Sequence, residues 1–522
     1  MSIFYNPPKF YPQEQNRRII ILYFAYFVKL YTFVADYNYW IMSGIIGRKI
    51  EIEELKRLYH SKKAQFVAVY GRRRVGKTYL INQVFKDKMT FHHTGLSPFD
   101  NNAKTTMADQ LQSFYFSLIR SGMDETVARP KSWLEAFFML EKLLIKLDNG
   151  ERQVVFIDEL SWMDTPRSGF LSAFESFWNG WASMRDNMML IVCGSSTTWM
   201  LSNLVNNYGG LYGRLTYEIK LSPFSLKECD EYLKSNGIIM MPYDVTQAYM
   251  IFGGIPYYLG FFLKGMSLAQ NVDKLLFARD AVLAKEFDRM FHSLFVHWKD
   301  YQKVVSLLAT RHYGFTRDEI SEKCGISMGG GLSDMLKSLI DSDFIAKYTP
   351  IANARSKEYY KLCDPFCAFY LKFVAGNSTA DHNFMQNSQN SQSYVSWRGF
   401  AFEQVCFNHI SQIKSALGIS GVVSRESALL VKGDENTQGA QIDLIIDRDD
   451  NVLNLCEMKF YKKDFTITQS DYSNFENKID VLSRITQSKK NIHFTLVTTK
   501  GVAYNEYSGI VQKIVTLDDL FK

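Results

Sequence analysis

The sequence has few cysteines and no close pairs of them. Its seven cysteines are scattered, their number is odd, and none belongs to a C-x-x-C pair. Disulfide frameworks and zinc sites need cysteines at such spacings, so we expect neither. Cys363 and Cys367, the closest two, lie in an apolar helical pattern that is typical of core packing. We therefore expect a reducing, cytoplasmic setting.

A strong excess of one charge is also lacking. The 60 Lys and Arg residues against 54 Asp and Glu residues give a net charge of +6. This balance is compatible with nucleic-acid binding but gives no argument for it, because an ordinary solvated surface explains it equally well. The hydrophobic content of 47% over 522 residues describes a globular protein with a sizeable core. The length predicts roughly three or four domains.

An uninterrupted apolar run long enough to span a membrane is lacking as well. Residues 19–34 are apolar and follow two arginines, but Lys29 interrupts them. They fall short of the about 20 apolar residues that a spanning helix needs, and no cleavage pattern is clear. Either residues 1–42 are an over-extended leader, with Met42 as the true start, or they form an anchor. We favour the leader and expect no membrane partner.

The strongest motif follows the apolar run at residues 66–70. It has the form G-x-x-x-x-G-K-T and leads at once into a helical pattern. Its glycines let backbone N–H groups turn around a phosphate, which the positive end of the following helix also attracts. Lys77 is expected to reach the β- and γ-phosphates, and the Thr78 hydroxyl to bind Mg²⁺. The predicted nucleotide-binding residues are Gly71, Arg72, Arg73, Arg74, Val75, Gly76, Lys77, Thr78, Tyr79 and Ser195.

A second apolar run, residues 154–157, ends in Asp158 and Glu159. Such a run is typical of a parallel strand that is buried on both faces. Asp158 is expected to hold Mg²⁺ through water, and Glu159 to polarise the water that attacks the phosphate. Together with the glycine-rich loop, this pair predicts ATP hydrolysis.

Three features each leave two interpretations open. Residues 43–59 either lie over the adenine or form an amphipathic helix packed on the sheet. Ser195 and Ser196, at the end of an apolar strand, either sense the γ-phosphate or cap a helix. Arg214 either reaches the γ-phosphate as a catalytic finger or forms a surface salt bridge.

Residues 300–362 have the pattern of a winged helix. Three helical segments, a glycine turn at 329–331 and two short strands follow one another, and Thr316 and Glu319 form a capping box. The third helix would read a major groove. However, its acidic residues outnumber its one lysine, so we weigh a protein–protein or structural role equally. Residues 377–396, rich in Asn, Ser and Gln, are expected to form a linker.

The last part of the chain carries a second constellation of charged residues. Asp443 lies in one predicted strand, and Glu457 and Lys459 form an E-x-K motif in the next. Residues two apart share a side of a strand, so these groups can converge on one face. Two carboxylates can hold Mg²⁺ at a scissile phosphate while the lysine positions water. The other interpretation is a polar strand pair held by salt bridges.

Five segments in this order, GRRRVGKT, VVFIDE, CGSS, YGR…LSPFS and GGIPY, resemble the archaeal-type ATPases of the AAA+/STAND-related branch of P-loop NTPases. The resemblance implies an α/β fold: a three-layer αβα P-loop NTPase core, a helical lid, a winged helix and a C-terminal PD-(D/E)XK, restriction-endonuclease-like domain. The expected divisions are a leader at 1–42, the ATPase core at 43–222, the lid at 223–298, the winged-helix module at 299–376, the linker at 377–396 and the nuclease-like domain at 397–522.

These features predict an ATP-binding and ATP-hydrolysing switch that is coupled to a nuclease-like domain acting on DNA, with ATP and Mg²⁺ as cofactors. The alternative is a regulatory ATPase whose degenerate nuclease fold binds nucleic acid or protein. A protein partner would then dock through the winged helix, and the oligomeric state stays open. The expected catalytic residues are Lys77, Glu159, Arg214, Asp443, Glu457 and Lys459, and the expected metal ligands are Thr78, Asp158, Asp443 and Glu457.

Overall fold

The computed structural model describes residues 45–522 except 101–102, 208, 352–356, 377–380, 432, 434–437 and 487–488. The predicted leader therefore lies outside the described residues. No helix in the described part of the chain is long and apolar enough to cross a membrane.

The N-terminal part is built on a five-stranded sheet in the order β2-β5-β6-β1-β7, with every strand parallel to its neighbours. Strands β1, β5 and β6 are buried along their whole length, as the continuous apolar runs predict. The strands are β1 (Gln65–Tyr70), β2 (Met89–Thr94), β5 (Gln153–Asp158), β6 (Met188–Gly194) and β7 (Tyr217–Lys220).

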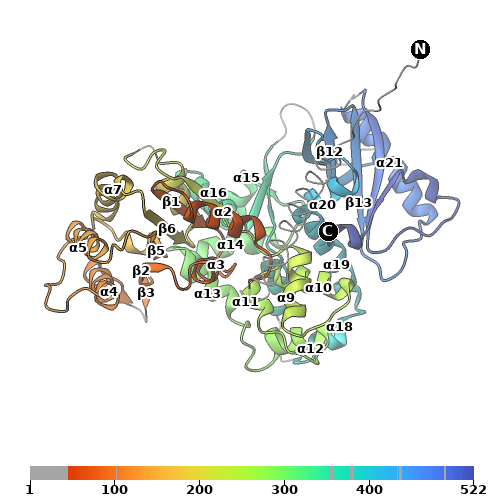
Figure 1. Ribbon diagram of the computed structural model, residues 1–522. Coiled ribbons are helices and arrows are strands. Elements are labelled where there is room, and N and C mark those ends of the chain that lie inside the picture. Colours follow the sequence, from red (N-terminus) through yellow and green to blue (C-terminus); the bar gives the residue numbers. More distant parts are fainter. Residues whose placement is uncertain are drawn as a thin grey trace, which may run out of the picture.

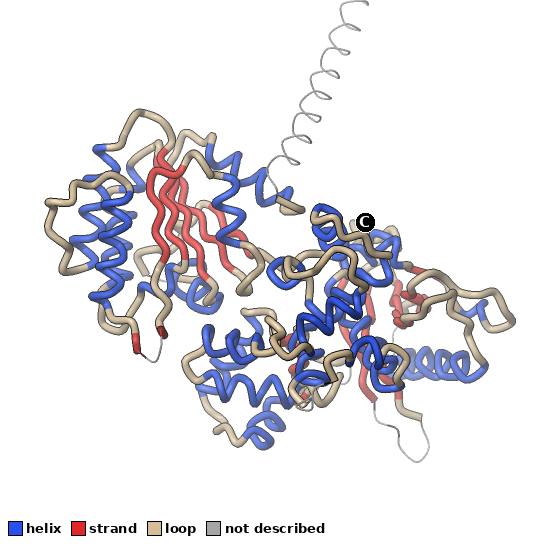
Figure 2. The backbone as a smooth tube through the Cα atoms, turned by 90° about the horizontal axis from the view of Figure 1, so that it is seen from below, coloured by secondary structure: helices blue, strands red, loops and turns tan. Residues whose placement is uncertain are grey.

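Helices cover both faces of this sheet (Figure 2). Alternate residues of β1 enter two separate core clusters, Val67 and Val69 on one face and Phe66 and Ala68 on the other. The first face is covered by α2 (Lys49–Tyr59) and α3 (Lys77–Val84), and the second by α4 (Met107–Arg120), α5 (Trp133–Lys146) and α7 (Phe170–Gly180). Short elements complete this part: β3 (Phe99–Asp100), β4 (Ala103–Lys104), α6 (Leu160–Met163) and α8 (Thr197–Met200).

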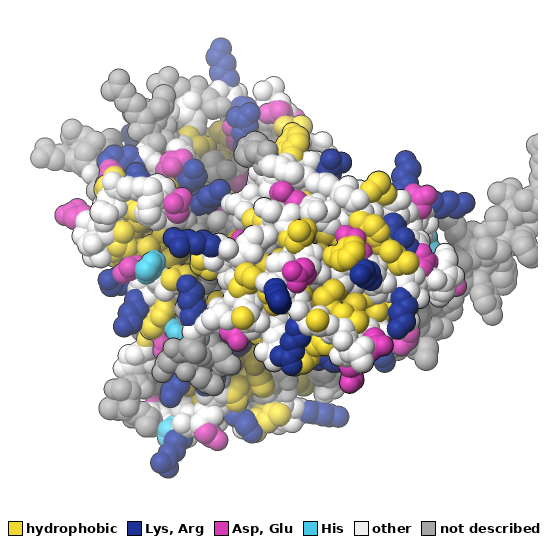
Figure 3. Space-filling model, turned by 90° about the vertical axis from the view of Figure 1, so that its left-hand side faces the viewer, with side chains coloured by type: hydrophobic (Ala, Val, Ile, Leu, Met, Phe, Trp, Pro, Cys, Tyr) yellow, Lys and Arg dark blue, Asp and Glu magenta, His cyan; other side chains and the backbone are white. Residues whose placement is uncertain are grey.

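The outer surface of the α4–α5 layer carries apolar side chains between scattered lysines and arginines (Figure 3). Leu134, Phe138 and Ile145 are exposed, and they recur at helical spacing along the solvent side of α5. The buried side of the same helix contributes Phe137, which packs against Phe174 and Phe177.

A helical segment follows the sheet. Its first helix begins with a capping box between Ser225 and Glu228, and glycines at 253 and 254, both with positive φ, end the second helix. The helices are α9 (Leu226–Ser235), α10 (Pro242–Phe252), α11 (Pro256–Leu259), α12 (Leu268–Val272) and α13 (Glu286–Leu294).

Three more helices and a small antiparallel sheet in the order β8-β10-β9 come next; we call residues 298–362 the three-helix segment. The Thr316–Glu319 capping box is confirmed. The glycine turn is not, because Gly330 and Gly331 open α16, and the Arg317 guanidinium ties the carbonyl of Gly329 at 3.0 Å. The elements are α14 (Trp298–Leu308), β8 (Phe315–Thr316), α15 (Arg317–Cys324), α16 (Gly330–Asp341), β9 (Ile345–Tyr348) and β10 (Tyr359–Leu362).

The C-terminal part has a five-stranded sheet in the order β11-β12-β13-β14-β15, antiparallel up to β13 and parallel beyond it. The expected linker is largely helical, because buried Met385 and Tyr394 anchor α18 and α19 in the core. The helices are α17 (Pro365–Phe369), α18 (Phe384–Ser388), α19 (Gln392–Asn408), α20 (Ile410–Ala416), α21 (Gln469–Thr486) and α22 (Leu517–Leu520). The strands are β11 (Ser424–Val431), β12 (Ala440–Arg448), β13 (Val452–Lys459), β14 (Asn491–Thr498) and β15 (Lys513–Val515).

The two large sheets lie at opposite ends of the molecule, with helices between them (Figure 1). One continuous apolar cluster nevertheless joins all the parts. It contains Val67 of the first sheet, Leu336 of the three-helix segment, Phe402 of α19 and Leu444 of the second sheet. The parts are therefore packed together through apolar side chains and not only through loops.

Candidate functional site

The glycine-rich loop lies at the carboxyl end of β1, where it turns into α3. Gly71 has φ +136°, and a Cβ there would approach the Leu221 carbonyl oxygen to 2.4 Å. Gly76, at the start of α3, has φ +94°. Both positions need the freedom of glycine. The loop thus turns back tightly, and the N-terminus of α3 faces the space it encloses.

Lys77 is buried at the base of this loop. Its ammonium group donates to the carbonyl oxygens of Gly71 at 2.9 Å and Arg72 at 3.0 Å. Burial lowers the pKa of Lys77, while Glu159 acts in the opposite direction. A cation held by backbone carbonyls in a buried site can exchange them for phosphate oxygens, which are stronger acceptors.

Two carboxylates lie beside the lysine at the end of β5. The Thr78 hydroxyl donates to Asp158 Oδ2 at 2.7 Å, and the Glu159 backbone N–H donates to Asp158 Oδ1 at 3.0 Å. Burial raises the pKa of Asp158. The hydroxyl oxygen of Thr78 and a carboxylate oxygen of Asp158 therefore lie within hydrogen-bond distance of each other.

Glu159 is held in a set orientation. Its backbone has φ 48°, in the left-handed region that is rare for a side chain of this kind. Ser195 donates to Glu159 Oε2 from its N–H at 3.0 Å and from its hydroxyl at 2.8 Å. Burial raises the pKa of Glu159. Ser195 thus contacts the carboxylate, and Ser196, at the N-terminus of α8, caps no backbone N–H with its side chain.

A cavity of about 670 Å³ opens beside the loop. Ile45, Ile46 and Arg48 form part of its wall, and Ile52 and Leu55 of the following helix α2 are buried in the core. Arg48 closes one side by donating to the Ser222 carbonyl oxygen at 2.7 Å and by stacking over Phe224 at 4.9 Å. The lining includes Ile45, Ile46, Arg48, Arg73, Arg74, Val75, Gly76, Lys77, Thr78, Tyr79, Glu159, Phe224, Tyr232, Asn236 and Tyr257.

The three loop arginines point to three different places. Arg73 lines the cavity and lies over Trp162 at 5.9 Å. Arg74 also lines it, pairs with Glu286 of α13 and stacks on Tyr257 at 4.2 Å. Arg72 turns away into a buried ion pair with a residue of the C-terminal half. Of the loop residues predicted to bind nucleotide, Arg72 therefore directs its side chain away from the cavity, and its carbonyl oxygen accepts from Lys77.

Arg214 lies at the wrong end of the sheet. The glycine-rich loop leaves β1 after Tyr70, opposite Lys220 of β7. Arg214 precedes β7 at the other end, where the Thr216 N–H donates to the Phe66 carbonyl. With a rise of about 3.3 Å per strand residue, roughly 15 Å of sheet separates the two. Arg214 therefore lies away from the glycine-rich loop of its own chain.

The E-x-K motif of the C-terminal sheet forms a compact charge cluster. Glu457 is bonded through one carboxylate oxygen to Lys459 at 3.0 Å and through the other to Lys478 of α21 at 2.6 Å. All three side chains are at most about a quarter exposed. The two ammonium groups neutralise the carboxylate from both sides.

Asp443 is one step beyond the last paired residues of β12 and β13, Leu444 and Cys456. Its Oδ1 accepts from Gln441 at 2.8 Å. Glu403 of α19 lies nearby, and its pKa is raised well above the usual range by burial and then by the charges of Asp443 and Glu457. The acids are thus neighbours, yet no group of three or more His, Cys, Asp or Glu side chains in the described ranges is placed to hold a metal ion.

Several residues of these sites carry no sequence signal. Lys478, Glu286 and Asp364 each pair with a site residue from a distant element. Their helices show ordinary amphipathic patterns, so spacing does not single them out. Arg48 stands just before α2 with φ 57°, which only the coordinates reveal.

The parallel sheet, the glycine-rich loop that opens a helix, and the acids at the end of β5 define a P-loop ATPase. Residues 46–262 match the family described as an ATPase domain predominantly from Archaea. An uncharacterized ATP-binding protein of Methanocaldococcus jannaschii is 46% identical over 50 residues, which are 9% of this chain and 85% of that protein. The chain belongs to this family of archaeal-type ATPases.

A second protein of the same organism, which is uncharacterized, is 25% identical over 363 residues, 69% of this chain and 76% of that protein. Among solved structures, a Walker-type ATPase of Pyrococcus abyssi has 19% identity and a TM-score of 0.42, and covers 63% of this chain and 96% of its own. The ORC2 protein of Aeropyrum pernix, solved with ADPNP and ADP, has 13% identity and a TM-score of 0.39, and covers 66% and 95%.

Proposed function

We propose that this protein is a nucleotide-driven switch, which binds and hydrolyses ATP at the P-loop and passes its nucleotide state to the C-terminal sheet. The observation that carries the proposal is the convergence of Lys77, Thr78, Asp158 and Glu159 at the ends of β1 and β5. Phosphoryl transfer needs mainly positioning and charge neutralisation, and these four groups supply both.

Mg²⁺ fits the donor set beside the loop. The Thr78 hydroxyl and the Asp158 carboxylate oxygen lie 2.7 Å apart, and hard oxygen ligands of this kind are those that Mg²⁺ prefers. Thr78 and Asp158 would hold the ion, with Asp158 acting through water. When bound, the ion would neutralise charge on the phosphate oxygens.

Lys77 and Glu159 have complementary roles in this proposal. Lys77 leaves the loop carbonyls and donates to the β- and γ-phosphate oxygens. Glu159 orients a water and takes its proton as the water oxygen bonds to the γ-phosphorus and the bond to the β,γ-bridging oxygen breaks. Ser195 positions Glu159 for this step through its two hydrogen bonds.

The remaining parts would form the output of the switch. We propose that residues 223–298 act as the helical lid, because α13 and Tyr257 contact Arg74 of the loop. Residues 299–376 would form a winged helix, supported by three helices and the β8-β10-β9 sheet. Residues 397–522 would be a PD-(D/E)XK-like domain that acts on DNA, supported by the Glu457–Lys459 pair next to Asp443.

A second candidate is a regulator without nuclease activity, and one observation favours it. Both oxygens of Glu457 are already bonded to ammonium groups. A carboxylate in that state does not fit the role of a metal ligand, so we derive no cleavage step there. In this version the C-terminal fold binds nucleic acid or a protein partner without cutting it.

The first experiment tests nucleotide use. Lys77→Ala should abolish ATP turnover, because it removes the buried ammonium group that would neutralise charge on the β- and γ-phosphates. Lys146→Ala, at the end of α5 in the outer helical layer, is the matched control and should behave as the wild type. Unchanged turnover in Lys77→Ala would contradict the proposal.

The second experiment separates the two candidates for the C-terminal domain. Plasmid DNA is incubated with the full chain, Mg²⁺ or Mn²⁺, and with or without ATP. Cleavage that is lost in Asp443→Ala but kept in Asp447→Ala, four residues along the same strand, supports a nuclease. DNA left intact under every condition supports the regulator.

A further inference from the structure

A short piece of chain connects the P-loop to the C-terminal acids. Residues 359–367, which we call the connecting segment, comprise β10 and the first turn of α17. It contains Lys361 in β10 and, three residues later, Asp364 just before α17. Lys361 and Asp443 together line two neighbouring cavities of about 1100 Å³ and 600 Å³.

Lys361, in β10 of the three-helix segment, contacts helix α19. Its ammonium nitrogen lies 3.5 Å from the centre of the Phe407 ring on α19. Burial lowers its pKa, and the charges of Asp443 and Glu403 act in the opposite direction. A protein cation thus occupies the surroundings of Asp443.

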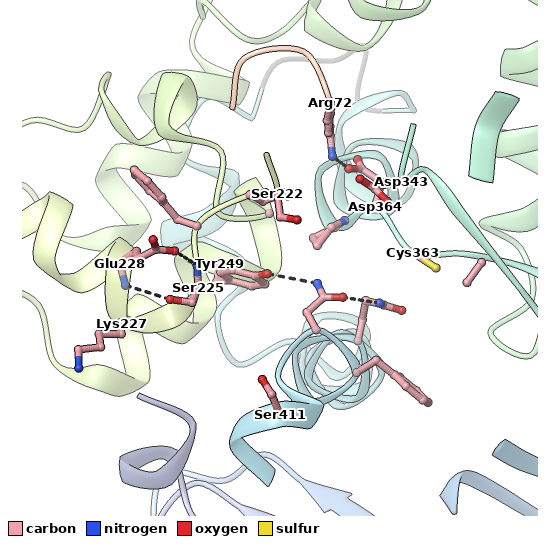
Figure 4. A pocket seen from close by; sticks show the side chains of 18 of the residues that line it. Arg72, Ser222, Ser225, Lys227, Glu228, Tyr249, Asp343, Cys363, Asp364 and Ser411 are labelled. Carbon is pink, nitrogen blue, oxygen red and sulfur yellow. Dashed lines mark hydrogen bonds and ion pairs between the residues drawn. The ribbon is translucent and has the colours of Figure 1, made fainter. Parts of the chain in front are cut away.

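Asp364 is bonded to the P-loop. Its carboxylate forms an ion pair with Arg72 (Figure 4), and both side chains are almost fully buried. Its Oδ1 also accepts from the Cys367 N–H at 2.7 Å and so caps α17. Arg72 lies over Phe344 at 5.1 Å and meets Met290 at 3.5 Å. A buried pair held by these contacts is costly to break by losing one partner.

Arg72 of the loop is connected both to the nucleotide site and to Asp364. The Arg72 carbonyl accepts from Lys77 at 3.0 Å. Phosphate oxygens that bind Lys77 would take this hydrogen bond away, while the Arg72 side chain stays bonded to Asp364. A change in the loop backbone is thereby transmitted to the connecting segment.

We propose that the Arg72–Asp364 pair is a latch through which nucleotide binding loosens the contact of Lys361 with the Asp443 site. In this structure Lys361 and Asp443 line the same two cavities. A backbone hydrogen bond of 2.7 Å from the Ile351 N–H to the Ala428 carbonyl, at the irregularity of β11, also joins the three-helix segment to the C-terminal sheet. The latch rests on the proposed ATP binding and specifies how it would regulate the C-terminal domain.

A second ion pair between the same two parts provides a control. Lys220 at the end of β7 bonds to Asp343 at 2.7 Å. Both side chains are more than a third exposed, and neither residue belongs to the glycine-rich loop. Asp343 has φ 59°, a conformation that asparagine tolerates well. Asp343→Asn therefore matches Asp364→Asn in chemistry and differs in its connection to the P-loop.

The experiment is hydrogen exchange of the full chain with and without a non-hydrolysable ATP analogue and Mg²⁺. In the wild type, the analogue should speed exchange of residues 359–362 and 424–431 at least about fivefold, the lower end of usual coupling between sites. Asp364→Asn should bind a fluorescent nucleotide but lose this response, and Asp343→Asn should keep it. If Asp364→Asn is poorly folded, the double variant Arg72→Met with Asp364→Asn removes both buried charges and should show the same loss.

Two results would overturn the latch while leaving ATP binding intact. One is a wild type that binds the analogue without faster exchange in these residues. The other is an Asp364→Asn or double variant that responds as the wild type does. Failure of the wild type to bind the analogue would overturn both the latch and the proposed function, and direct binding of the fluorescent nucleotide distinguishes this case from the other two.

Discussion

The acidic residues of the two large sheets have opposite kinds of partners. Asp158 and Glu159 in the first sheet are bonded to neutral groups, the Thr78 hydroxyl and the N–H and hydroxyl of Ser195. Glu457 in the second sheet is bonded to two lysines. Burial raises the pKa of both acids in the first sheet. Because Asp158 and Glu159 are bonded to neutral donors, an incoming cation can still neutralise their charge. The charge of Glu457 is already neutralised by two lysines.

The largest effect should come from Glu159→Gln. Loss of a general base lowers the rate by about 10²–10⁴-fold, while the cavity for nucleotide keeps its shape. ATP turnover and fluorescent-nucleotide binding, measured side by side, should show lost hydrolysis with retained binding. The unfolding temperature should be equal to or higher than that of the wild type, because the variant no longer buries this charge. A marked loss of stability would break the comparison.

Glu457→Gln should have the reverse profile. Removing the carboxylate leaves two largely buried ammonium groups without their common partner, which we expect to cost about 3 kcal/mol. Thermal unfolding of the full chain should show the loss, and ATP turnover at a temperature where the variant is folded should stay near the wild-type value. If the variant is as stable as the wild type, Glu457 is not the structural counterpart of Glu159.

His93 extends the comparison to a buried titratable side chain whose hydrogen-bond partner is a neutral hydroxyl. It contacts Ser117 at 2.9 Å and packs edge-on against Phe114, and burial lowers its pKa to about 3. In the unfolded chain the His93 imidazole has the higher pKa, so it takes up a proton first as the pH falls. The free energy of unfolding therefore decreases as the pH falls below about 6.5. Between pH 7 and 5 the loss should be about 2 kcal/mol.

This prediction is checked by denaturant midpoints at the two pH values. His93→Gln should remove the His93 contribution of about 2 kcal/mol from the pH-dependent difference, while the exposed His60→Gln control should keep it. Equal pH dependence in His93→Gln and the wild type would show that the His93 side chain is not the source.

The smallest effect should come from Glu358→Gln. Glu358 bonds to Lys347 across β9 and β10 at 2.9 Å, but both side chains are about half exposed. Such pairs contribute at most about 1 kcal/mol. Thermal unfolding should differ little from the wild type. A loss as large as that of Glu457→Gln would show that burial does not set the difference between the two pairs.

The parts of the site that the sequence predicts are those whose signal is local. The loop glycines, Lys77 and the strand that ends in Asp158 each follow from a run of neighbouring residues, and so does the Thr316 cap. The Arg72–Asp364 pair joins residues 292 positions apart, and no spacing rule connects them. The end of the sheet at which Arg214 lies depends on the direction of β7 relative to β1, which spacing along the chain does not give. A run of glycines predicts a turn, although the first positions of a helix tolerate Gly330 and Gly331 as well.

The continuous apolar cluster also bears on how the chain holds together when it is cut. Helix α10 packs against α9, α17 and α19, and α22 packs on α20 and α10. A fragment ending near residue 222 would lack these helices, so Ile219 and Leu221, which belong to the same apolar cluster, would lose their partners in it. We expect such a fragment to aggregate rather than fold. Heat should then melt the full chain in one broad step, and a useful truncation has to keep α19 and α22 with the ATPase core.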